Sequence, residues 1–194
     1  MTAAPDPMSG IARVGPFAGF YQRFEELIGS SSQITLYFIH SRRWRENHDA
    51  AIKAFLQRAG TGLEAFLPDL EDHELMFSLA KHFEDGAQIP WMVTDAYRYT
   101  ARMAREYRKP VQVRLFRRYP TYSFYRFDER AVLALYSNAI AKKDLPAFEI
   151  TMDSLMGRFL AAEIADLRKE CRKIDPEDLE GVISNATGET FGGL

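Results

Sequence analysis

The sequence has few of the residues on which disulfide and metal chemistry depend. Its 194 residues include one cysteine, Cys171, and four histidines. A single cysteine excludes an internal disulfide framework and any zinc site built from several cysteines. The histidines do not stand at a metal-ligand spacing on one helix face with a third ligand nearby, so we expect no metal. They are His40, His48, His73 and His82.

Long apolar runs and phosphate-binding glycine loops are also lacking. Each apolar run is only a few residues long, far short of the ~20 residues that cross a bilayer. The Pro- and Gly-rich start has no basic patch followed by an apolar stretch, so we expect no secretory signal. Gly60-Thr61-Gly62 is a lone turn, and no serine occupies a nucleophile elbow. We therefore expect a soluble, reduced, cytoplasmic protein with no membrane span and no cofactor.

The composition is that of a chain with one core of its own. Hydrophobic residues make up 46% of the sequence and charged residues 27%, which is typical of a globular domain rather than a disordered chain. The length suits a single domain. We expect a flexible leader over residues 1–16, an α/β domain over 17–173, and an acidic, then Gly/Ser/Thr-rich tail over 174–194.

Charge is segregated along the chain, although the net charge is only −2. The stretch from Tyr97 to Arg130 holds ten basic and three acidic residues, whereas acidic residues dominate on both sides of it. Clustered arginine favours anion binding, because the guanidinium fork suits phosphate oxygens. The alternative is a solvated helix face paired with acids elsewhere in the fold. The pI near 6.1 and the acidic flanks do not favour binding to duplex nucleic acid.

Hydrophobic spacing predicts the element order α-β-α-β-α-α-β-β-β-α. Strands separated by helices predict a parallel sheet, and the last two strands, joined at Asp128-Glu129-Arg130, predict an antiparallel hairpin. The expected fold class is α/β, with a mixed, mainly parallel sheet that ends in an antiparallel hairpin and is flanked by helices. We expect helices at 17–29, 41–60, 72–84, 90–109 and 153–173, and strands at 33–39, 63–67, 111–116, 123–127 and 131–136.

The junction between the first predicted strand and the next helix, Phe38 to Trp44, is a candidate ligand site. A helix start with Ser41 as its N-cap presents unpaired N–H groups, which attract anions. Ligands of open α/β sheets also gather at the carboxyl ends of strands. His40 is the junction group that titrates near neutral pH. We expect His40, Ser41, Arg42 and Arg43 to bind a ligand; the alternative is a half-buried His40 with solvated arginines.

The segment from Thr121 to Asn138 carries a family resemblance. In the phospholipase D superfamily, a His-x-Lys-x-x-x-x-Asp motif starts one strand and turns into a second strand, which ends in Gly-Ser near an Asn. In this chain Asp128 follows Thr121 by seven positions and Asn138 follows Asp128 by ten, while Ser137 comes one position late and the Gly is absent. The element order is similar from Phe17 to Leu167. The sequence therefore resembles a phospholipase D half-domain, and the resemblance implies that fold.

The two most diagnostic residues of the motif are replaced, the His by Thr121 and the Lys by Ser123. In the family, the His attacks phosphorus and the Lys holds phosphate oxygens. A threonine hydroxyl without an adjacent base is a poor nucleophile, and serine offers a neutral hydrogen bond in place of a positive charge. The resemblance thus implies a pseudoenzyme with Thr121, Ser123 and Asp128 at degenerate positions and no catalytic residue.

Arginines and tyrosines remain around the degenerate motif, and such residues can hold a phosphate and stack a base or sugar. We therefore predict a non-catalytic binding or regulatory module of a bacterial system. Its ligand would be a phosphorylated or nucleotide-like molecule or a partner protein, and the resemblance implies a homodimer. The predicted ligand-binding residues are His40, Ser41, Arg42, Arg43, Arg117, Arg118, Tyr122, Ser123, Tyr125, Arg126, Ser137 and Asn138.

Two other functions stay open at this point. One is an active phosphodiesterase or nuclease in which His40 substitutes for the missing histidine. The other is a nucleotide-processing effector of the Toll/interleukin receptor-like type, because the polar junction after the first predicted strand is similar to that family. The Tyr-rich hairpin does not match that second family.

Overall fold

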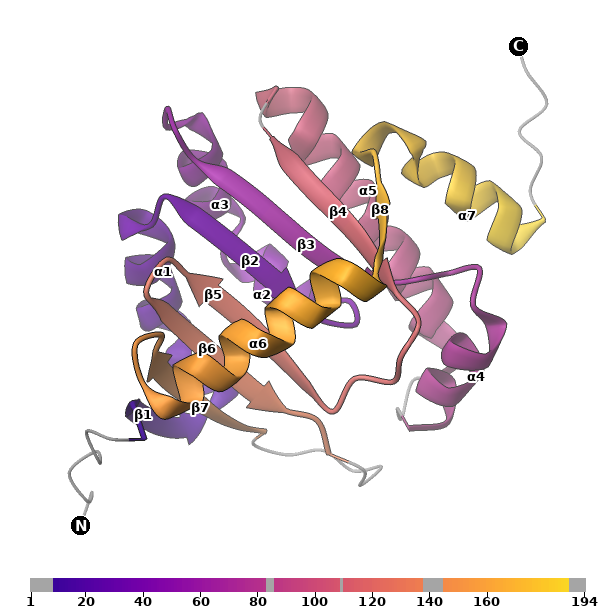
Figure 1. Ribbon diagram of the computed structural model, residues 1–194. Helices are drawn as coiled ribbons and strands as arrows, with labels where there is room; N and C mark the ends of the chain where they lie inside the picture. Colours follow the sequence, from indigo (N-terminus) through magenta and orange to yellow (C-terminus); the bar gives the residue numbers. More distant parts are fainter. Residues whose placement is uncertain (1–8, 83–85, 109, 138–144, 189–194) are drawn as a thin grey trace.

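The computed structural model describes residues 9–82, 86–108, 110–137 and 145–188. These residues form a mixed sheet of eight strands with helices on both faces (Figure 1). Its strand order is β1-β7-β6-β5-β2-β3-β4-β8. The strands are β1 (Ile11–Pro16), β2 (Gln33–Tyr37), β3 (Gly62–Pro68), β4 (Val111–Phe116), β5 (Tyr122–Phe127), β6 (Arg130–Leu135), β7 (Pro146–Thr151) and β8 (Arg172–Ile174).

The helices divide unequally between the two faces of the sheet. In Figure 1, α6 crosses the front face, while α1, α2, α3 and α5 lie behind it. The helices are α1 (Tyr21–Ser30), α2 (Arg42–Asn47), α3 (Asp49–Gln57), α4 (His73–His82), α5 (Ile89–Tyr107), α6 (Leu155–Glu170) and α7 (Leu179–Thr187), with 3-10 turns η1 (Phe17–Phe20), η2 (Gly86–Gln88) and η3 (Pro176–Asp178). The predicted α/β class is confirmed.

The parallel part of the sheet is smaller than the sequence predicts. Among the described strands, the pairings β2–β3 and β3–β4 are parallel and the other five are antiparallel. The predicted hairpin is confirmed as β5–β6, and β5 also lies antiparallel beside β2. The difference arises because β1, β7 and β8 were not expected as strands. Gly and Pro interrupt the pattern of β1, and β7 begins with Pro, so neither shows the uninterrupted alternation of a strand.

Both ends of the described chain are more ordered than predicted. Residues 11–16, expected as part of a flexible leader, form β1 and pair with β7. Residues 179–187, expected in a loose tail, form α7, which packs on α5 through Leu179, Val182 and Ile183. The last predicted helix ends at Glu170, and Arg172–Ile174 pairs with β4 instead. Tertiary pairing gives these short segments the hydrogen bonds and burial that they lack alone.

The second predicted helix is broken in two. The sequence predicts one helix over 41–60, but the chain forms α2 and α3, with His48 between them at φ −112° and ψ 15°. The His48 ring is buried, and its Nδ1 lies 2.6 Å from Glu25 Oε1 of α1. The break therefore lets His48 pair with α1 while Trp44 still reaches the sheet.

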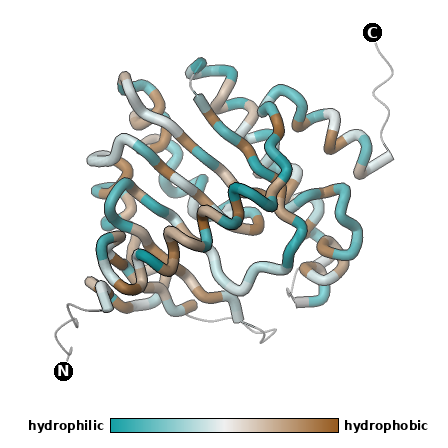
Figure 2. Tube along the Cα trace, in the orientation of Figure 1, coloured by the Kyte–Doolittle hydropathy of each residue, from teal (hydrophilic) through white to brown (hydrophobic). Residues whose placement is uncertain are grey.

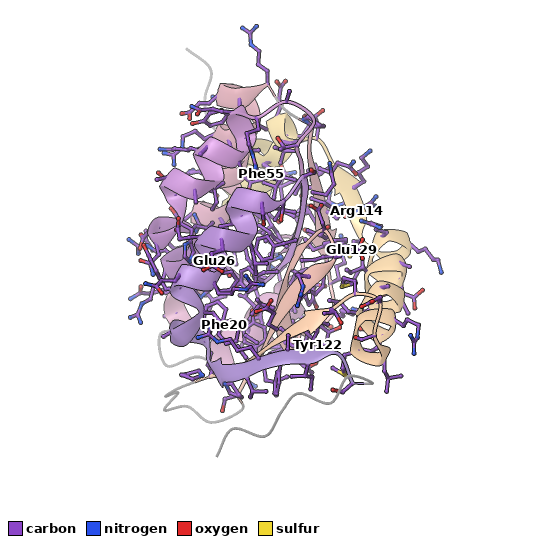
Figure 3. The ribbon with its side chains drawn as sticks, turned by 90° about the vertical axis from the view of Figure 1, so that its left-hand side faces the viewer. Phe20, Glu26, Phe55, Arg114, Tyr122 and Glu129 are labelled. Atoms are coloured by element: carbon purple, nitrogen blue, oxygen red, sulfur yellow. The ribbon has the colours of Figure 1, made fainter. Side chains whose placement is uncertain are left out.

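Buried apolar residues lie on both faces of the sheet, since Leu160, Ile164 and Leu167 of α6 belong to the same core as the residues of the helix layer behind the sheet. Figure 3 shows Phe20 and Phe55 on the side of the sheet that α1, α2, α3 and α5 cover, here called the helix side, whereas Arg114 and Glu129 lie on the side of α6. In Figure 2 hydrophobic and hydrophilic residues alternate along the elements. Within the described ranges, none of the helices combines the length and the apolar character needed to cross a membrane.

Candidate functional site

A cavity of about 620 Å³ opens at the carboxyl end of β2. It lies between the helix-side face of the sheet and helices α2 and α5, and it takes residues from β5 and β6 as well. Ligands of α/β sheets commonly bind at such a strand end. Its polar lining consists of His40, Ser41, Arg42, Arg43, Glu46, Gln88, Ser123, Tyr125 and Tyr136.

Strand pairing brings the two sequence-predicted segments together at this cavity. Tyr37 pairs with Phe124 across β2 and β5, so the residues after β2 lie beside the start of β5. Side chains alternate along a strand, so Ser123 and Tyr125 share one face of β5 and Tyr122 and Arg126 share the other. Tyr122 and Arg126 therefore point away from the cavity.

Hydroxyl groups linked to one another form the floor of the cavity. Ser41 Oγ lies 2.5 Å from Tyr125 Oη, and Ser123 hydrogen-bonds to the phenols of both Tyr125 and Tyr136. The Ile39 backbone N–H donates to Tyr136 Oη at 3.2 Å. Burial raises the pKa of Tyr125 to about 12 and also raises the pKa of Tyr136, so both phenols are neutral at pH 7.

Ser41 does not cap the following helix as the sequence predicts. Its backbone is left-handed, with φ 45° and ψ 34°, and its side chain makes no capping hydrogen bond. The hydroxyl is instead bonded to Tyr125 Oη. Because the left-handed conformation costs free energy for a residue other than glycine, Ser41 is held in it by its surroundings. The turn directs Ser41 toward the sheet and starts α2 with Arg42.

His40 is neutral at pH 7. The pKa of its imidazole is lowered to about 4, mainly by burial and next by the Arg45 guanidinium, with a smaller decrease from Arg42 and an opposing effect of Asp95. His40 Nδ1 accepts a hydrogen bond from the Arg42 backbone N–H at 3.3 Å, which places the ring proton on Nε2. The one unprotonated ring nitrogen thus already accepts a hydrogen bond. His40 is poorly suited to attack phosphorus or to act as a base.

A prediction follows for the pH dependence of stability. Unfolded His40 takes up a proton as pH falls through 6.5, whereas the folded protein resists protonation until about pH 4. His40 therefore lowers stability progressively between these values, by about 2–3 kcal/mol at pH 4.5. We expect His40→Gln to lose less stability than the parent between pH 7 and pH 4.5 in urea unfolding. The exposed His73→Gln is the control, and a parent-like pH curve for His40→Gln contradicts the assignment.

The arginines of the junction differ in how they are held. Arg42 Nε lies 2.8 Å from Glu46 Oε1, and its guanidinium lies 5.0 Å from the centroid of the Trp91 ring. Arg45 is buried away from the mouth, where it pairs with Asp95 at 2.6 Å and donates to the His40 carbonyl. Arg43 is exposed and makes no ion pair with any described residue. Arg43 is therefore the cation at the mouth that is available to an anion.

Arg117 and Arg118 are not part of this cavity. They line a separate one of about 520 Å³, together with Cys171 and Arg172, beside the C-terminal end of α6. Arg117 Nε donates to the buried Asp69 at 2.9 Å, while Arg118 lies 3.6 Å from Glu170 and 3.9 Å from Glu163. Burial raises the pKa of the Cys171 thiol to about 11, so the thiol is unreactive. These arginines form ion pairs with acidic residues of the fold and do not line the cavity that contains His40.

The other predicted residues also lie apart. Tyr122 Oη donates to Glu163 of α6 at 2.7 Å. Arg126 Nε donates to the Asp128 carbonyl at 2.9 Å, in a polar groove of about 870 Å³ on the α6 side. Thr121 is exposed and Ser137 is half-buried, and neither is part of the lining. Asn138 lies outside the described residues.

Asp128 has a structural role at the opposite end of the sheet. It is in the turn between β5 and β6 with φ 47°. Its carboxylate accepts hydrogen bonds from the backbone N–H groups of Ser32 and Gln33, both at 2.8 Å. These contacts join the hairpin turn to the start of β2. The aspartate of the family spacing is thus far from the cavity.

Sequence reasoning did not assign the apolar residues that line the cavity to a ligand site. Phe17, Trp44, Ile89, Met92 and Leu145 contribute to it. Helical spacing identified most of them as inward-facing or left them in loops, but periodicity cannot show that η1, α2 and α5 converge. Trp44 is buried, and its indole N–H has no acceptor among the described residues. Such an unpaired donor is uncommon in a folded protein.

A metal ion has no evident ligands in the structure. No three His, Cys, Asp or Glu side chains gather as metal ligands would, within the residues described above. The polar groups that line the cavity are hydroxyls, a neutral imidazole, arginines, the Glu46 carboxylate and the Gln88 amide.

Comparison with known proteins identifies the fold. No protein-family model matches the sequence, and no curated protein matches it. Among solved structures, Nuc, a phospholipase D family member from Salmonella typhimurium, has a TM-score of 0.52 at 12% identity over 84% of this chain and 96% of its own. Phosphatidylserine synthase from Haemophilus influenzae has a TM-score of 0.57 at 14% identity over 90% of this chain and 44% of its own. The fold is phospholipase D-like.

A third structure is similar over a shorter part. TrmBL2, an archaeal chromatin protein with a novel mode of DNA binding, has a TM-score of 0.49 at 14% identity over 81% of this chain. This chain spans 50% of TrmBL2 and 44% of the synthase. At these identities the likeness concerns the fold alone.

Proposed function

We propose that this protein is a non-catalytic phospholipase D-like module that binds a phosphorylated, nucleotide-like ligand in the cavity at the end of β2. The observation that carries the proposal is the environment of Ser123, which stands where the family motif has lysine. Ser123 is 4% exposed and is hydrogen-bonded to Tyr125 and Tyr136. Neutral hydroxyls fill the place at which the family holds phosphate with an ammonium group.

The loss of catalysis rests on the two replaced residues and on His40. Thr121 is exposed and outside the cavity lining, and the unprotonated nitrogen of His40 accepts a backbone hydrogen bond. General acid–base catalysis contributes about 10²–10⁴-fold, and covalent catalysis is lost with the nucleophile. Hydrolysis of a phosphodiester by this cavity should be negligible.

Ligand binding is supported by the shape and charge of the cavity. Its volume of about 620 Å³ falls within the range of small-molecule sites. Aromatic side chains and a few convergent polar groups line it, and Arg43 at its mouth lacks an acidic partner in the described chain. A partner protein as ligand is the alternative within the same proposal.

The proposal keeps the homodimer that the family resemblance implies, and it keeps the cytoplasm of a bacterium as the expected location. Leu155 and Phe159 on α6 and Leu135 on β6 are exposed large apolar side chains that a dimer could cover. Sedimentation equilibrium at micromolar concentration tests the dimer, and a monomer mass at every concentration contradicts it. Nucleic acid is not favoured, because the pI is near 6.1 and acidic stretches flank the basic one.

Catalytic silence can be tested with a generic phosphodiester, bis(p-nitrophenyl) phosphate. We expect the parent protein and His40→Ala to release no nitrophenolate above the rate in buffer. Turnover by the parent that His40→Ala abolishes would establish the phosphodiesterase alternative and contradict this proposal.

Binding can be tested by thermal shift with nucleoside monophosphates. A ligand at ~100 times its Kd stabilises the folded state by ~2.7 kcal/mol, which is readily detected. We expect Arg43→Gln to weaken binding about tenfold, in line with loss of a charge-assisted hydrogen bond. The matched control is Arg105→Gln, an exposed arginine of α5 outside the cavity. An equal effect of both substitutions contradicts the site.

A further inference from the structure

Charge is unevenly distributed along the depth of the cavity. Its deepest residues are neutral: Tyr125 and Ser123 are 2% and 4% exposed, and Trp44 is 4% exposed. Its charged residues, Arg42, Arg43 and Glu46, are exposed at the mouth. No cationic side chain reaches the floor among the described lining residues. The cavity thus has an uncharged, partly aromatic interior and a cationic entrance.

Building on the proposed function, we propose that the ligand is an aromatic ring that carries a phosphate and that it binds ring first. The ring lies inside against the wall formed by Trp44, Phe17 and Tyr125, and the phosphate stays at the mouth on Arg43. This orientation is the reverse of the one that a phosphodiester would need in order to reach Ser123.

The floor is unsuited to a phosphate group. Burying an anion without a counter-charge is costly, and a neutral hydroxyl does not offset that cost. The hydroxyls of Ser41, Ser123, Tyr125 and Tyr136 are also already bonded to one another or to backbone. A phosphate at the floor would have to break these bonds while receiving no positive charge.

The interior is well suited to a planar ring. Tyr125 packs directly on Trp44 and Phe17, with ring centroids 4.8 Å and 5.5 Å apart, so the three rings form one aromatic wall against which a planar ring can lie. Ile89 and Met92 of α5 supply apolar contact on the other side of the cavity. Aromatic side chains stack on bases with little dependence on base identity. The buried indole N–H of Trp44 also lacks an acceptor in the described residues.

The mouth of the cavity holds two arginines, of which Arg43 can contact an anion directly and Arg42 only after it leaves Glu46. Arg43 has no acidic partner among the described residues, whereas Arg42 is held by Glu46 and lies over Trp91. An incoming phosphate competes with the Glu46 carboxylate for Arg42, because both are oxygen acceptors for the guanidinium fork. Arg43 is therefore the first contact of the phosphate.

Calorimetric titration of the full chain tests the orientation with three probes: adenosine monophosphate, adenosine and ribose 5-phosphate. We expect adenosine monophosphate to bind tightest and ribose 5-phosphate to bind at least tenfold more weakly. Arg43→Gln should weaken adenosine monophosphate about tenfold and leave adenosine unchanged. The control Arg105→Gln should bind all three like the parent.

Substitution of Ser123 separates the two orientations. In the ring-first orientation, Ser123→Lys places a charge beneath the ring and weakens adenosine monophosphate; in the reverse orientation it strengthens both phosphates. If Ser123→Lys does not fold, Ser123→Ala serves, with equal changes for adenosine and its monophosphate expected. The orientation alone is overturned if ribose 5-phosphate binds as tightly as adenosine monophosphate does. It is also overturned if Ser123→Lys binds the two phosphates more tightly than the parent does. Failure of all three probes, and of uridine monophosphate, overturns the proposed function as well.

Discussion

Replacement of Phe24 by alanine is expected to cost about 3–5 kcal/mol of folding free energy, the usual range for deleting a buried phenyl ring. Phe24 is 1% exposed. Its ring centroid lies 5.3 Å from that of Tyr125 and 5.7 Å from that of Trp44. The cavity left behind would adjoin both walls of the candidate site. Because a domain is stable by only about 5–15 kcal/mol, much of the total would be lost.

Urea unfolding at pH 7 measures this loss, and Phe77→Ala is the matched control. Phe77 is 62% exposed on α4 and has Lys81 Nζ 4.2 Å from its ring centroid. Its removal should cost less than about 1 kcal/mol. Similar losses for the two variants would show that the group around Phe24 is not the centre of the core. A folded Phe24→Ala should also bind nucleotide more weakly, because Trp44 and Tyr125 lose support.

The second large effect concerns Asp128, which the family spacing marks as a motif residue. Asp128→Ala is expected to cost about 2–3 kcal/mol, because two charge-assisted hydrogen bonds are lost. The backbone groups of Ser32 and Gln33 that donate them are exposed and can turn to water, which keeps the loss at the low end. Alanine also fits the left-handed turn, φ 47°, less well than aspartate.

Asparagine is the matched control at this position. It keeps an amide oxygen as acceptor and tolerates the left-handed conformation, so Asp128→Asn should lose roughly half as much free energy of unfolding. Ligand affinity should not change in either variant, since the carboxylate is bonded to the start of β2 and the cavity opens at the end of β2. A variant that keeps full stability but loses binding would give Asp128 a direct role at the cavity.

The local elements were largely predictable because they depend on short-range pattern. The strands Val111–Phe116 and Tyr122–Phe127 are rich in β-forming residues, and the long helix α5 has a clear apolar face. Strand β7 was not predictable in the same way, since Pro146 starts it and the buried Glu149 interrupts its apolar pattern. Glu149 is buried because Arg23, far away in the chain, bonds to it at 2.9 Å. Such a pairing leaves no mark in local sequence.

The candidate site shows the same division. Its position at the end of β2 and the involvement of His40, Ser41, Arg42, Arg43, Ser123 and Tyr125 were predicted, and these residues do line one cavity. Arg117, Arg118, Tyr122 and Arg126 were grouped with them on sequence proximity. The pleat turns Tyr122 and Arg126 to the other face of the sheet, where Tyr122 donates to Glu163. Arg117 is paired with Asp69, and Arg118 with Glu163 and Glu170.

The amino-acid order alone determined the α/β class, most helices and strands, and the presence of hydroxyl residues at Thr121 and Ser123, because each is a matter of residue identity or short spacing. Only the tertiary structure decided that Ser123 is closed into a network with two tyrosines, that His40 is neutral, and that the cations stand at the entrance of the cavity. Burial and the partners of a group set its charge and reach, and both come from segments distant in the chain.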